Sequence, residues 1–262
     1  MCGIAGYSLA GDSCVDRTLA AQALLAGIAE RGADAAGYAH RGTSAAVTIH
    51  KQRTGATALL EEIELPAHAT EALVHVRDYT KGHPRLLANN HPIRHGSVVG
   101  IHNGVIANDD EIFARYGIDR AEPGMTVDSE AIFALVQRSG ADHSALEELR
   151  GTMATAWMDE RTPRGLCLAR GVARPLWIGR TRHELFFAST KAALEVVEGT
   201  LRLTLRKREV AEGRLFHIAD GTILTEKRFR PDPSYRTRTT VQPVATPHEG
   251  VLCLAKLATL AA

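Results

Sequence analysis

The second half of the sequence is a succession of short β-forming runs, and this pattern limits the fold more than any other feature. From Thr152 onward, short apolar stretches alternate with Gly and charged turns. The predicted strands are Ala154–Met158, Leu166–Ala169, Leu176–Ile178, Leu185–Ala188, Arg214–Ile218 and Thr222–Thr225, and one predicted helix, Thr190–Val197, interrupts them. Many strands with few helices indicate stacked sheets flanked by helices.

The first half begins with a short apolar strand, Gly3–Leu9, followed by an Ala- and Leu-rich helix, Asp16–Glu30. Arg31-Gly32 stops this helix and begins a tight turn. Asn103-Gly104 is a strong turn pair, so a strand is expected to end there. The remaining predictions are strands at Ala45–Gln52, Leu73–Arg77 and Ser97–His102 and helices at Asp109–Tyr116 and Ser129–Arg138.

The composition is that of an ordinary globular protein. The chain has 262 residues, 45% of them hydrophobic and 23% charged, which allows one large domain or two small ones. A net charge of +1 gives no reason to expect nucleic acid or a membrane surface as a partner. No apolar run reaches membrane-spanning length, and the N-terminus lacks the pattern of a secretory signal.

Four widely separated cysteines, without a C-x-x-C pair, argue against a zinc site or a disulfide framework. Free thiols fit a reducing, cytoplasmic setting best. The twelve histidines are scattered without metal-ligand spacing, so neither a metal nor a cofactor is expected.

The C-terminal segment, residues 230–262, differs in amino-acid composition from the domain expected over residues 1–229. Arg230–Pro247 is rich in Pro, Arg and Thr and predicts a flexible tail or an extended arm. Val251–Leu260 is apolar, and as a helix it could dock on this domain or on a partner.

Cys2 follows the initiator methionine directly. Met is normally trimmed before a small residue, and trimming would leave Cys2 with a free α-amine beside its own thiol. An α-amine has a pKa of about 8, lower than that of Lys, so it can serve as the base for this nucleophile. Taken alone, a cysteine at the second position is a weak signal.

Six motifs accompany Cys2 and occur in one order along the chain. They are MCGIAGY at the start, RGADAAG at Arg31–Gly37, VHVRDYTKG at Val74–Gly82, NNHPI at Asn89–Ile93, HNGVI at His102–Ile106 and VDSEAI at Val127–Ile132. With them the sequence resembles the class II glutamine amidotransferases, which include the glutaminase domains of glucosamine-6-phosphate synthase and amidophosphoribosyltransferase. The resemblance runs from Met1 to about Leu194.

The resemblance implies an α+β fold of the N-terminal-nucleophile hydrolase type, a four-layer αββα sandwich with two mainly antiparallel sheets. It implies hydrolysis of L-glutamine to L-glutamate and ammonia through a thioester on Cys2. Attack on the side-chain amide builds an oxyanion, which needs preorganised donors. The resemblance assigns this role to the Asn103 side chain and the Gly104 N–H, and it places Arg31 beside the nucleophile.

Free glutamine also presents a carboxylate and an ammonium group. Arg77 offers a forked cation for the carboxylate, and Asp128 offers an anion for the ammonium. The resemblance adds Thr80 and Gly32 to the substrate-binding positions. Alternative interpretations are a surface arginine at a strand end for Arg77 and a helix N-cap for Asp128. His91 is expected to shape the pocket rather than to act as the base.

Two positions depart from the family pattern. Asp78 stands where the synthase branch commonly has an aromatic residue, and Lys81 replaces a histidine or a small residue. Lys81 belongs to the segment Tyr79–Arg85, the candidate closing loop, and Asp78 directly precedes that segment.

Three functional hypotheses follow. The first is a glutaminase subunit that passes ammonia to a separate synthase, with Arg230–Ala262 as the docking arm and homo-oligomerisation left open. The second is a catalytically silent, amidotransferase-like structural or interaction protein. The third is an N-terminal-nucleophile amidohydrolase with another substrate, against which Arg77 and Asp128 argue because they suit the two charged ends of an amino acid.

Overall fold

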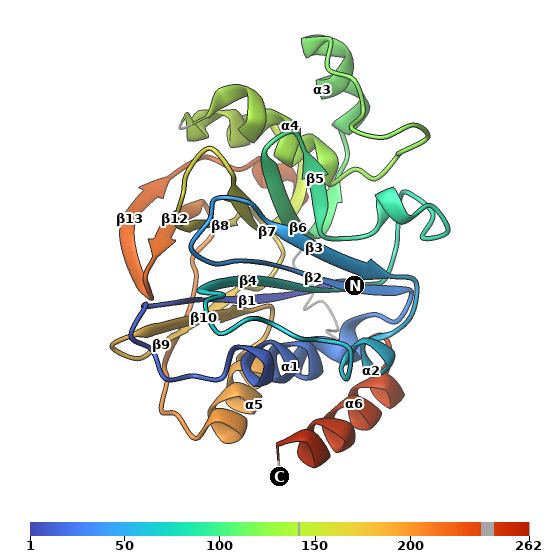
Figure 1. The fold of residues 1–262 in the computed structure, drawn as a ribbon. Coiled ribbons are helices and arrows are strands. Elements are labelled where there is room, and N and C mark those ends of the chain that lie inside the picture. The colour runs from blue at the N-terminus through green and yellow to red at the C-terminus, as the bar shows by residue number, and fades with distance from the viewer. Residues whose placement is uncertain (141, 237–243, 262) are drawn as a thin grey trace.

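A computed structural model describes residues 1–140, 142–236 and 244–261 of the chain. Within them the strands form two sheets, and every pair of neighbouring strands is antiparallel. Helices cover the outer face of each sheet (Figure 1). This is the predicted four-layer αββα arrangement.

The first sheet has seven strands in the order β11-β9-β10-β1-β4-β2-β3. Its strands are β1 Gly3–Leu9, β2 Ala35–Arg41, β3 Thr48–Gln52, β4 Glu71–Arg77, β9 Trp177–Arg180, β10 Glu184–Ala188 and β11 Arg206–Glu209. Strand β1 is central, between β4 and β10, and all seven of its residues are buried. An uninterrupted buried run is typical of a strand with both faces covered.

The second sheet has six strands in the order β13-β12-β8-β7-β6-β5. They are β5 Ile93–His95, β6 Val98–Ile106, β7 Gly151–Asp159, β8 Leu166–Arg170, β12 Arg214–Ala219 and β13 Thr222–Arg228. The two sheets pack face to face through a fully buried apolar layer that includes Ile4, Ile101, Phe187 and Phe216.

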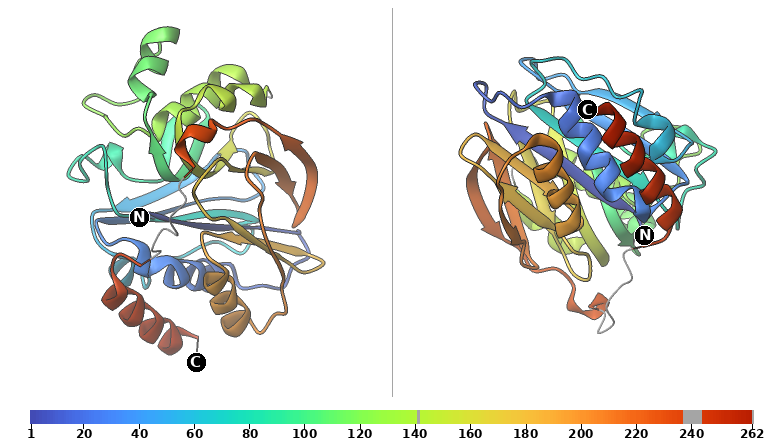
Figure 2. Two further views of the ribbon diagram at one scale, coloured as in Figure 1. Left: turned by 180° about the vertical axis from the view of Figure 1, so that it is seen from behind. Right: turned by 90° about the horizontal axis from the view of Figure 1, so that it is seen from below.

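Helices α1 (Arg17–Ile28), α2 (Ala56–Leu59), α5 (Lys191–Leu201) and α6 (Pro247–Leu260) lie on the first sheet, and α4 (Glu130–Ser139) covers the second (Figures 1 and 2). Helix α3 (Asp109–Tyr116) packs against α4 and projects away from the sheet. Short 3-10 turns are η1 Ala29–Arg31, η2 Leu87–Asn89, η3 His143–Glu148 and η4 Pro233–Tyr235. No helix in the described ranges combines the length and the apolar character that crossing a bilayer demands.

Helix α6 docks on this domain. It lies alongside α1 and α2, and its Cys253 and Leu257 are buried in the apolar layer beneath the first sheet (Figure 2). Glu249 Oε1 accepts the Thr57 N–H at 2.8 Å at one end of the helix. Of the predicted flexible tail or extended arm, residues 237–243 lie outside the described residues.

The structure corrects several local predictions. Strands β2, β5 and β11 were not predicted, and Asn103-Gly104 does not form a turn. Strand β6 continues through this pair to Ile106, with Asn103 opposite Ala154 and Gly104 opposite Met153 on β7. The neighbouring strand thus overrides the local turn preference.

Candidate active site

Cys2 lies directly before the central strand β1, and its half-buried thiol faces a narrow cleft. Sγ donates to the Asp78 carbonyl oxygen at 3.4 Å. Burial raises the pKa of the Cys2 thiol to about 11, and the nearby Arg77 guanidinium opposes this shift. The thiol is therefore protonated at neutral pH, and its attack on a substrate requires a base.

The N-terminal amine belongs to Met1, the residue directly before Cys2. With Met1 in place, its ammonium group pairs with the Asp78 carboxylate. Burial lowers the pKa of this amine, and the Arg31 and Arg174 charges lower it further. A lowered pKa leaves more of the amine as free base at neutral pH.

Arg31 fixes the backbone of the nucleophile from behind. Its Nε donates to the Cys2 carbonyl oxygen at 2.9 Å, while Nη1 and Nη2 are buried without a partner among the described residues. Gly32, next in the chain, packs against the Arg77 backbone so closely that a Cβ would lie 2.4 Å from the Arg77 carbonyl carbon. Only glycine fits there.

Arg77 ends β4, and its guanidinium is fully engaged. Nη1 donates to Asn90 Oδ1 at 2.5 Å, and Nη2 donates to the Lys81 carbonyl oxygen at 2.9 Å and to that of Gly82. The alternative of a surface arginine is wrong, because Arg77 is 2% exposed. It holds the candidate closing loop against the cleft.

The candidate oxyanion donors lie side by side on β6. Gly104 has φ +153° and lines the cleft, and a Cβ there would lie 1.9 Å from the Thr152 carbonyl oxygen. Asn103 is 1% exposed, and its Nδ2 has no hydrogen-bond partner in the described part of the chain. A buried donor without a partner is costly unless a ligand uses it.

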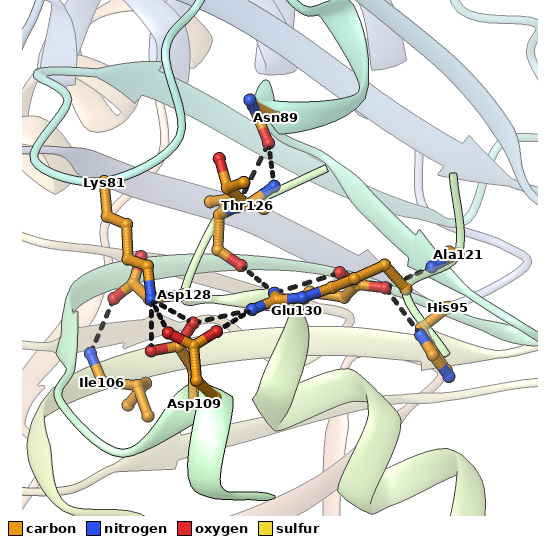
Figure 3. A network of polar contacts seen from close by, with 12 residues as sticks. Lys81, Asn89, His95, Ile106, Asp109, Ala121, Thr126, Asp128 and Glu130 are labelled. Atoms are coloured by element: carbon orange, nitrogen blue, oxygen red, sulfur yellow. Dashed lines mark hydrogen bonds and ion pairs between the residues drawn. The ribbon is translucent and has the colours of Figure 1, made fainter. Parts of the chain in front are cut away.

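Asp128 lies one residue before the N-cap of α4, which is Ser129, so the predicted cap position is wrong. The Asp128 carboxylate accepts the Ile106 N–H from β6 at 2.6 Å (Figure 3). Burial raises its pKa to about 6. The carboxylate is thus ionised at neutral pH in a poorly solvated place, where an ammonium group would stabilise it.

A charged network closes the side of the cleft (Figure 3). Lys81 Nζ lies 2.7 Å from both carboxylate oxygens of Asp109 and 2.9 Å from Asp110 Oδ2. Arg120 bonds the same two aspartates and also pairs with Glu130. Lys81 therefore ties the Tyr79–Arg85 loop to the start of α3.

Three buried histidines, His75, His91 and His102, surround the inner end of the cleft. The rings of His75 and His91 stack with centroids 4.1 Å apart. Burial lowers the pKa of His75 and of His102 to about 3 and that of His91 well below its usual value. With pKa values this far below the ordinary one, all three imidazoles are weak bases, which agrees with a base other than histidine.

The cleft brings together most of the predicted site. Its lining includes Cys2, Arg77, Thr80, Gly104 and Asp128. Arg31 lies behind Cys2, Gly32 lies behind Arg77, and Asn103 is buried outside the lining. The enclosed volume is about 10 Å³, room for one water molecule and not for an amino acid.

Two residues of this environment were not predicted as site residues. Asp78 was noticed only as a departure from the family pattern, yet it contacts both the amine and the thiol. Arg174 follows Ala173, which has a positive φ of 59°, and its charge acts on Cys2 and on the N-terminal amine. Its segment ARPLWIG, Ala173–Gly179, lies within the stretch from Met1 to about Leu194 over which the sequence resembles the family, and this was the signal that could have identified it.

Comparison with known proteins identifies the family to which this chain is similar. A family model described as a glutamine amidotransferase domain matches residues 83–196. The glutamine–fructose-6-phosphate aminotransferase (isomerizing) of Shigella flexneri is 32% identical over 189 residues, which cover 68% of this chain and 30% of that protein. The corresponding enzyme of Escherichia coli K12 is 31% identical over the same length. The chain spans about a third of the length of these curated relatives.

Solved structures share the fold. The glutamine phosphoribosylpyrophosphate amidotransferase of B. subtilis, complexed with ADP and GMP, superposes with a TM-score of 0.69 at 22% identity, over 86% of this chain and 49% of that one. A glutamine aminotransferase class-II domain protein from Silicibacter pomeroyi gives 0.53 at 17% identity, over 87% of this chain and 100% of that one. With its ordered motifs, its matched domain and its αββα fold, the chain belongs to the class II, N-terminal-nucleophile glutamine amidotransferases.

Proposed function

We propose that this chain hydrolyses L-glutamine to L-glutamate and ammonia, with Cys2 as the nucleophile after Met1 has been removed. The observation that carries the proposal is that one cleft gathers Cys2, Arg77, Gly104 and Asp128 from four separate segments. Together they offer a nucleophile, a carboxylate partner, an oxyanion donor and an ammonium partner, which is what one glutamine molecule requires.

In this mechanism the free α-amine of Cys2 takes the proton from Sγ, and the thiolate attacks the side-chain amide carbon. The oxyanion accepts hydrogen bonds from Asn103 Nδ2 and the Gly104 N–H. The protonated amine then gives its proton to the departing nitrogen, which leaves as ammonia. A water molecule, deprotonated by the same amine, attacks the thioester and releases glutamate.

Substrate entry requires movement of the loop. Because the cleft holds about 10 Å³, glutamine fits only when the loop has moved away. The substrate carboxylate would then replace the Lys81 and Gly82 carbonyls at Arg77, with Thr80 beside it. Asp128 would take the ammonium group, while Arg31 would keep the nucleophile in position.

The ammonia, on this proposal, passes to a separate synthase in the cytoplasm. In the Shigella flexneri aminotransferase the aligned region is only 30% of the protein, so there the glutaminase-like part is joined to a longer remainder. Ammonia released into water near neutral pH becomes ammonium, which is no longer a nucleophile, so a sealed route would be needed.

The test is release of glutamate from glutamine by protein shown by intact mass to lack Met1. Cys2→Ala is expected to lower kcat by several orders of magnitude and leave unfolding unchanged. Cys167→Ala, which removes a thiol outside the cleft, is the matched control. If Met1-free, folded protein releases no glutamate, alone or with a synthase, the silent structural role replaces this proposal.

A further inference from the structure

Three arginines converge at the β11 edge of the first sheet, away from the cleft. Arg180 ends β9 and Arg206 begins β11, and the two are directly opposite each other in the antiparallel pair. Arg182 follows in the turn before β10. With Thr181, Thr204 and Leu205 they line a cavity of about 540 Å³.

Within residues 1–140, 142–236 and 244–261, these three arginines have no acidic partner. None of them makes an ion pair or a side-chain hydrogen bond with any described residue, and Arg180 Nε is buried without a partner. The carboxylates nearby are engaged elsewhere. Glu184 is bonded to Ser13 and Thr181, Glu195 to Lys191, Glu198 to Lys207, and Glu209 to Arg170.

Like charges directly opposite each other on paired strands are destabilising. The strands also keep these charges together. Arg180 lies two residues after Ile178 on β9. The side chains of Arg180 and Ile178 therefore point to the same face of the sheet, the face that packs against the second sheet. The antiparallel pairing thus places two arginines opposite each other, Arg180 half-buried and Arg206 exposed, with no carboxylate bonded to either among the described residues.

Guanidinium groups fixed on strands suit an anion with several oxygens. Each presents a planar fork of N–H donors that matches phosphate geometry, and two or three around one cavity can neutralise more than one negative charge. The volume of about 540 Å³ lies in the range of small-molecule sites. With a net charge of only +1, the chain lacks the extended basic surface that nucleic acid requires.

We propose that this cavity binds a small molecule bearing a phosphate or diphosphate group, at a site separate from the glutaminase cleft. Strand β10 separates the two places: Ala188, at one end, pairs with Ala5 near the nucleophile, and Glu184, at the other, pairs with Leu9 beside the turn that carries Arg182. The ligand therefore does not contact the reacting atoms at Cys2.

The test uses the full chain and inorganic pyrophosphate as the probe. Thermal unfolding and calorimetric titration compare pyrophosphate, orthophosphate and citrate at equal ionic strength. We expect pyrophosphate to raise Tm more than citrate does, since its two phosphate groups share one bridging oxygen and hold their charge in a smaller volume than the three carboxylates of citrate. Arg180→Gln and Arg206→Gln should each weaken pyrophosphate binding at least about tenfold.

Arg53→Gln is the matched control, because Arg53 is an exposed, unpaired arginine just after β3, at the opposite edge of the same sheet. It should bind pyrophosphate as the wild type does. Without ligand, Arg206→Gln should unfold at the wild-type temperature or above it, since it relieves the repulsion. Absence of a pyrophosphate effect in the wild type, an equal effect of citrate, or unchanged binding in both cavity variants would overturn the proposal.

None of these arginines lines the glutaminase cleft, so the rate of glutamine hydrolysis can be measured as a control that does not depend on pyrophosphate binding. The variants are expected to keep the glutaminase kcat of the parent chain. Loss of pyrophosphate binding with intact turnover would locate the defect in this cavity. A failure of glutaminase activity in the wild type would leave the binding result unaffected.

Discussion

Arg77 Nη1 donates to Asn90 Oδ1 at 2.5 Å, and the other terminal nitrogen of the same guanidinium donates to two carbonyls of the closing loop. The proposed partner of the substrate carboxylate thus also holds the loop shut. Substrate binding and loop closure therefore compete for one side chain, so a bound glutamine would favour the open loop.

Arg77→Lys keeps the charge and loses the forked geometry. We expect the KM for glutamine to rise by about ten- to a hundredfold while kcat falls less, because the lost contacts are made by bound substrate as well as by the transition state. Steady-state kinetics measure both constants. Arg94→Lys, an arginine paired with Glu160 on the other sheet, serves as control. Unchanged kinetics in Arg77→Lys would show that Arg77 does not bind substrate.

Asp128→Asn should stabilise the fold and impair the enzyme. The pKa of Asp128 in the folded protein is about 6, above its ordinary value of 3.8. Ionisation of Asp128 therefore lowers the free energy of unfolding as pH rises from 3.8 through 6. Asparagine avoids that cost and can still accept the Ile106 N–H. We expect a gain in unfolding free energy of about 1–3 kcal/mol at pH 8 that shrinks toward pH 4.5.

The same variant should bind glutamine poorly, since a neutral amide cannot pair with the ammonium group. In the wild type, the affinity for glutamine should fall as pH drops below about 6. Denaturant titrations and KM measurements across this range check both effects. A gain in stability that does not depend on pH would show that ionisation of Asp128 is not its source.

Arg120 and Lys81 share the Asp109 carboxylate, yet their loss should have different effects. Asp109 and Glu130 are 2% and 0% exposed, so Arg120→Met leaves two buried carboxylates short of a partner and should cost about 3–5 kcal/mol of stability. Lys81→Met leaves Asp109 paired with Arg120 and should cost about 1 kcal/mol or less.

In Lys81→Met the effect should instead be local. We expect faster hydrogen exchange over Tyr79–Arg85, measured by mass spectrometry, without a large change in Tm. Arg115→Met, which removes a partly exposed pair with Glu148, is the control for Arg120→Met. Equal losses of stability in all three variants would contradict this account of the network.

Retention of Met1 should abolish activity without unfolding the protein. With Met1 present, the Cys2 nitrogen is a peptide nitrogen and cannot act as a base, while the Met1 ammonium pairs with Asp78. A preparation separated by intact mass into Met1-containing and Met1-free forms should release glutamate only from the second. Equal activity in both forms would rule out the α-amine of Cys2 as the base.

Much of the fold followed from sequence patterns, and the exceptions have physical causes. Strands β1 and β4 were predicted because they are apolar runs. Strand β2, AAGYAHR, has weak β-propensity and forms because it is buried between β3 and β4. Strand β11, RKRE, is a charged edge strand whose sequence looks like a loop.

At the site, the ordered motifs identified the segments but not every contact. The closeness of Asp78 to the N-terminal amine depends on where β4 ends relative to β1, which no local pattern encodes. The same holds for Arg174, which is brought to Cys2 from the segment between β8 and β9. Local sequence also favoured a turn at Asn103-Gly104, where pairing with β7 keeps the strand extended.

The central position of β1 has a consequence for how the enzyme matures. Its neighbour β10 extends to residue 188, so the first strand is enclosed on both sides only after nearly three quarters of the chain has been synthesised. Once that happens, Met1 is 18% exposed and paired with Asp78, a poor target for an aminopeptidase. At 5–20 residues per second, 188 residues emerge in roughly 10 to 40 s. On the proposed mechanism, Met1 would therefore have to be removed before the first sheet closes around β1, and a chain that still carries Met1 when it folds would be inactive.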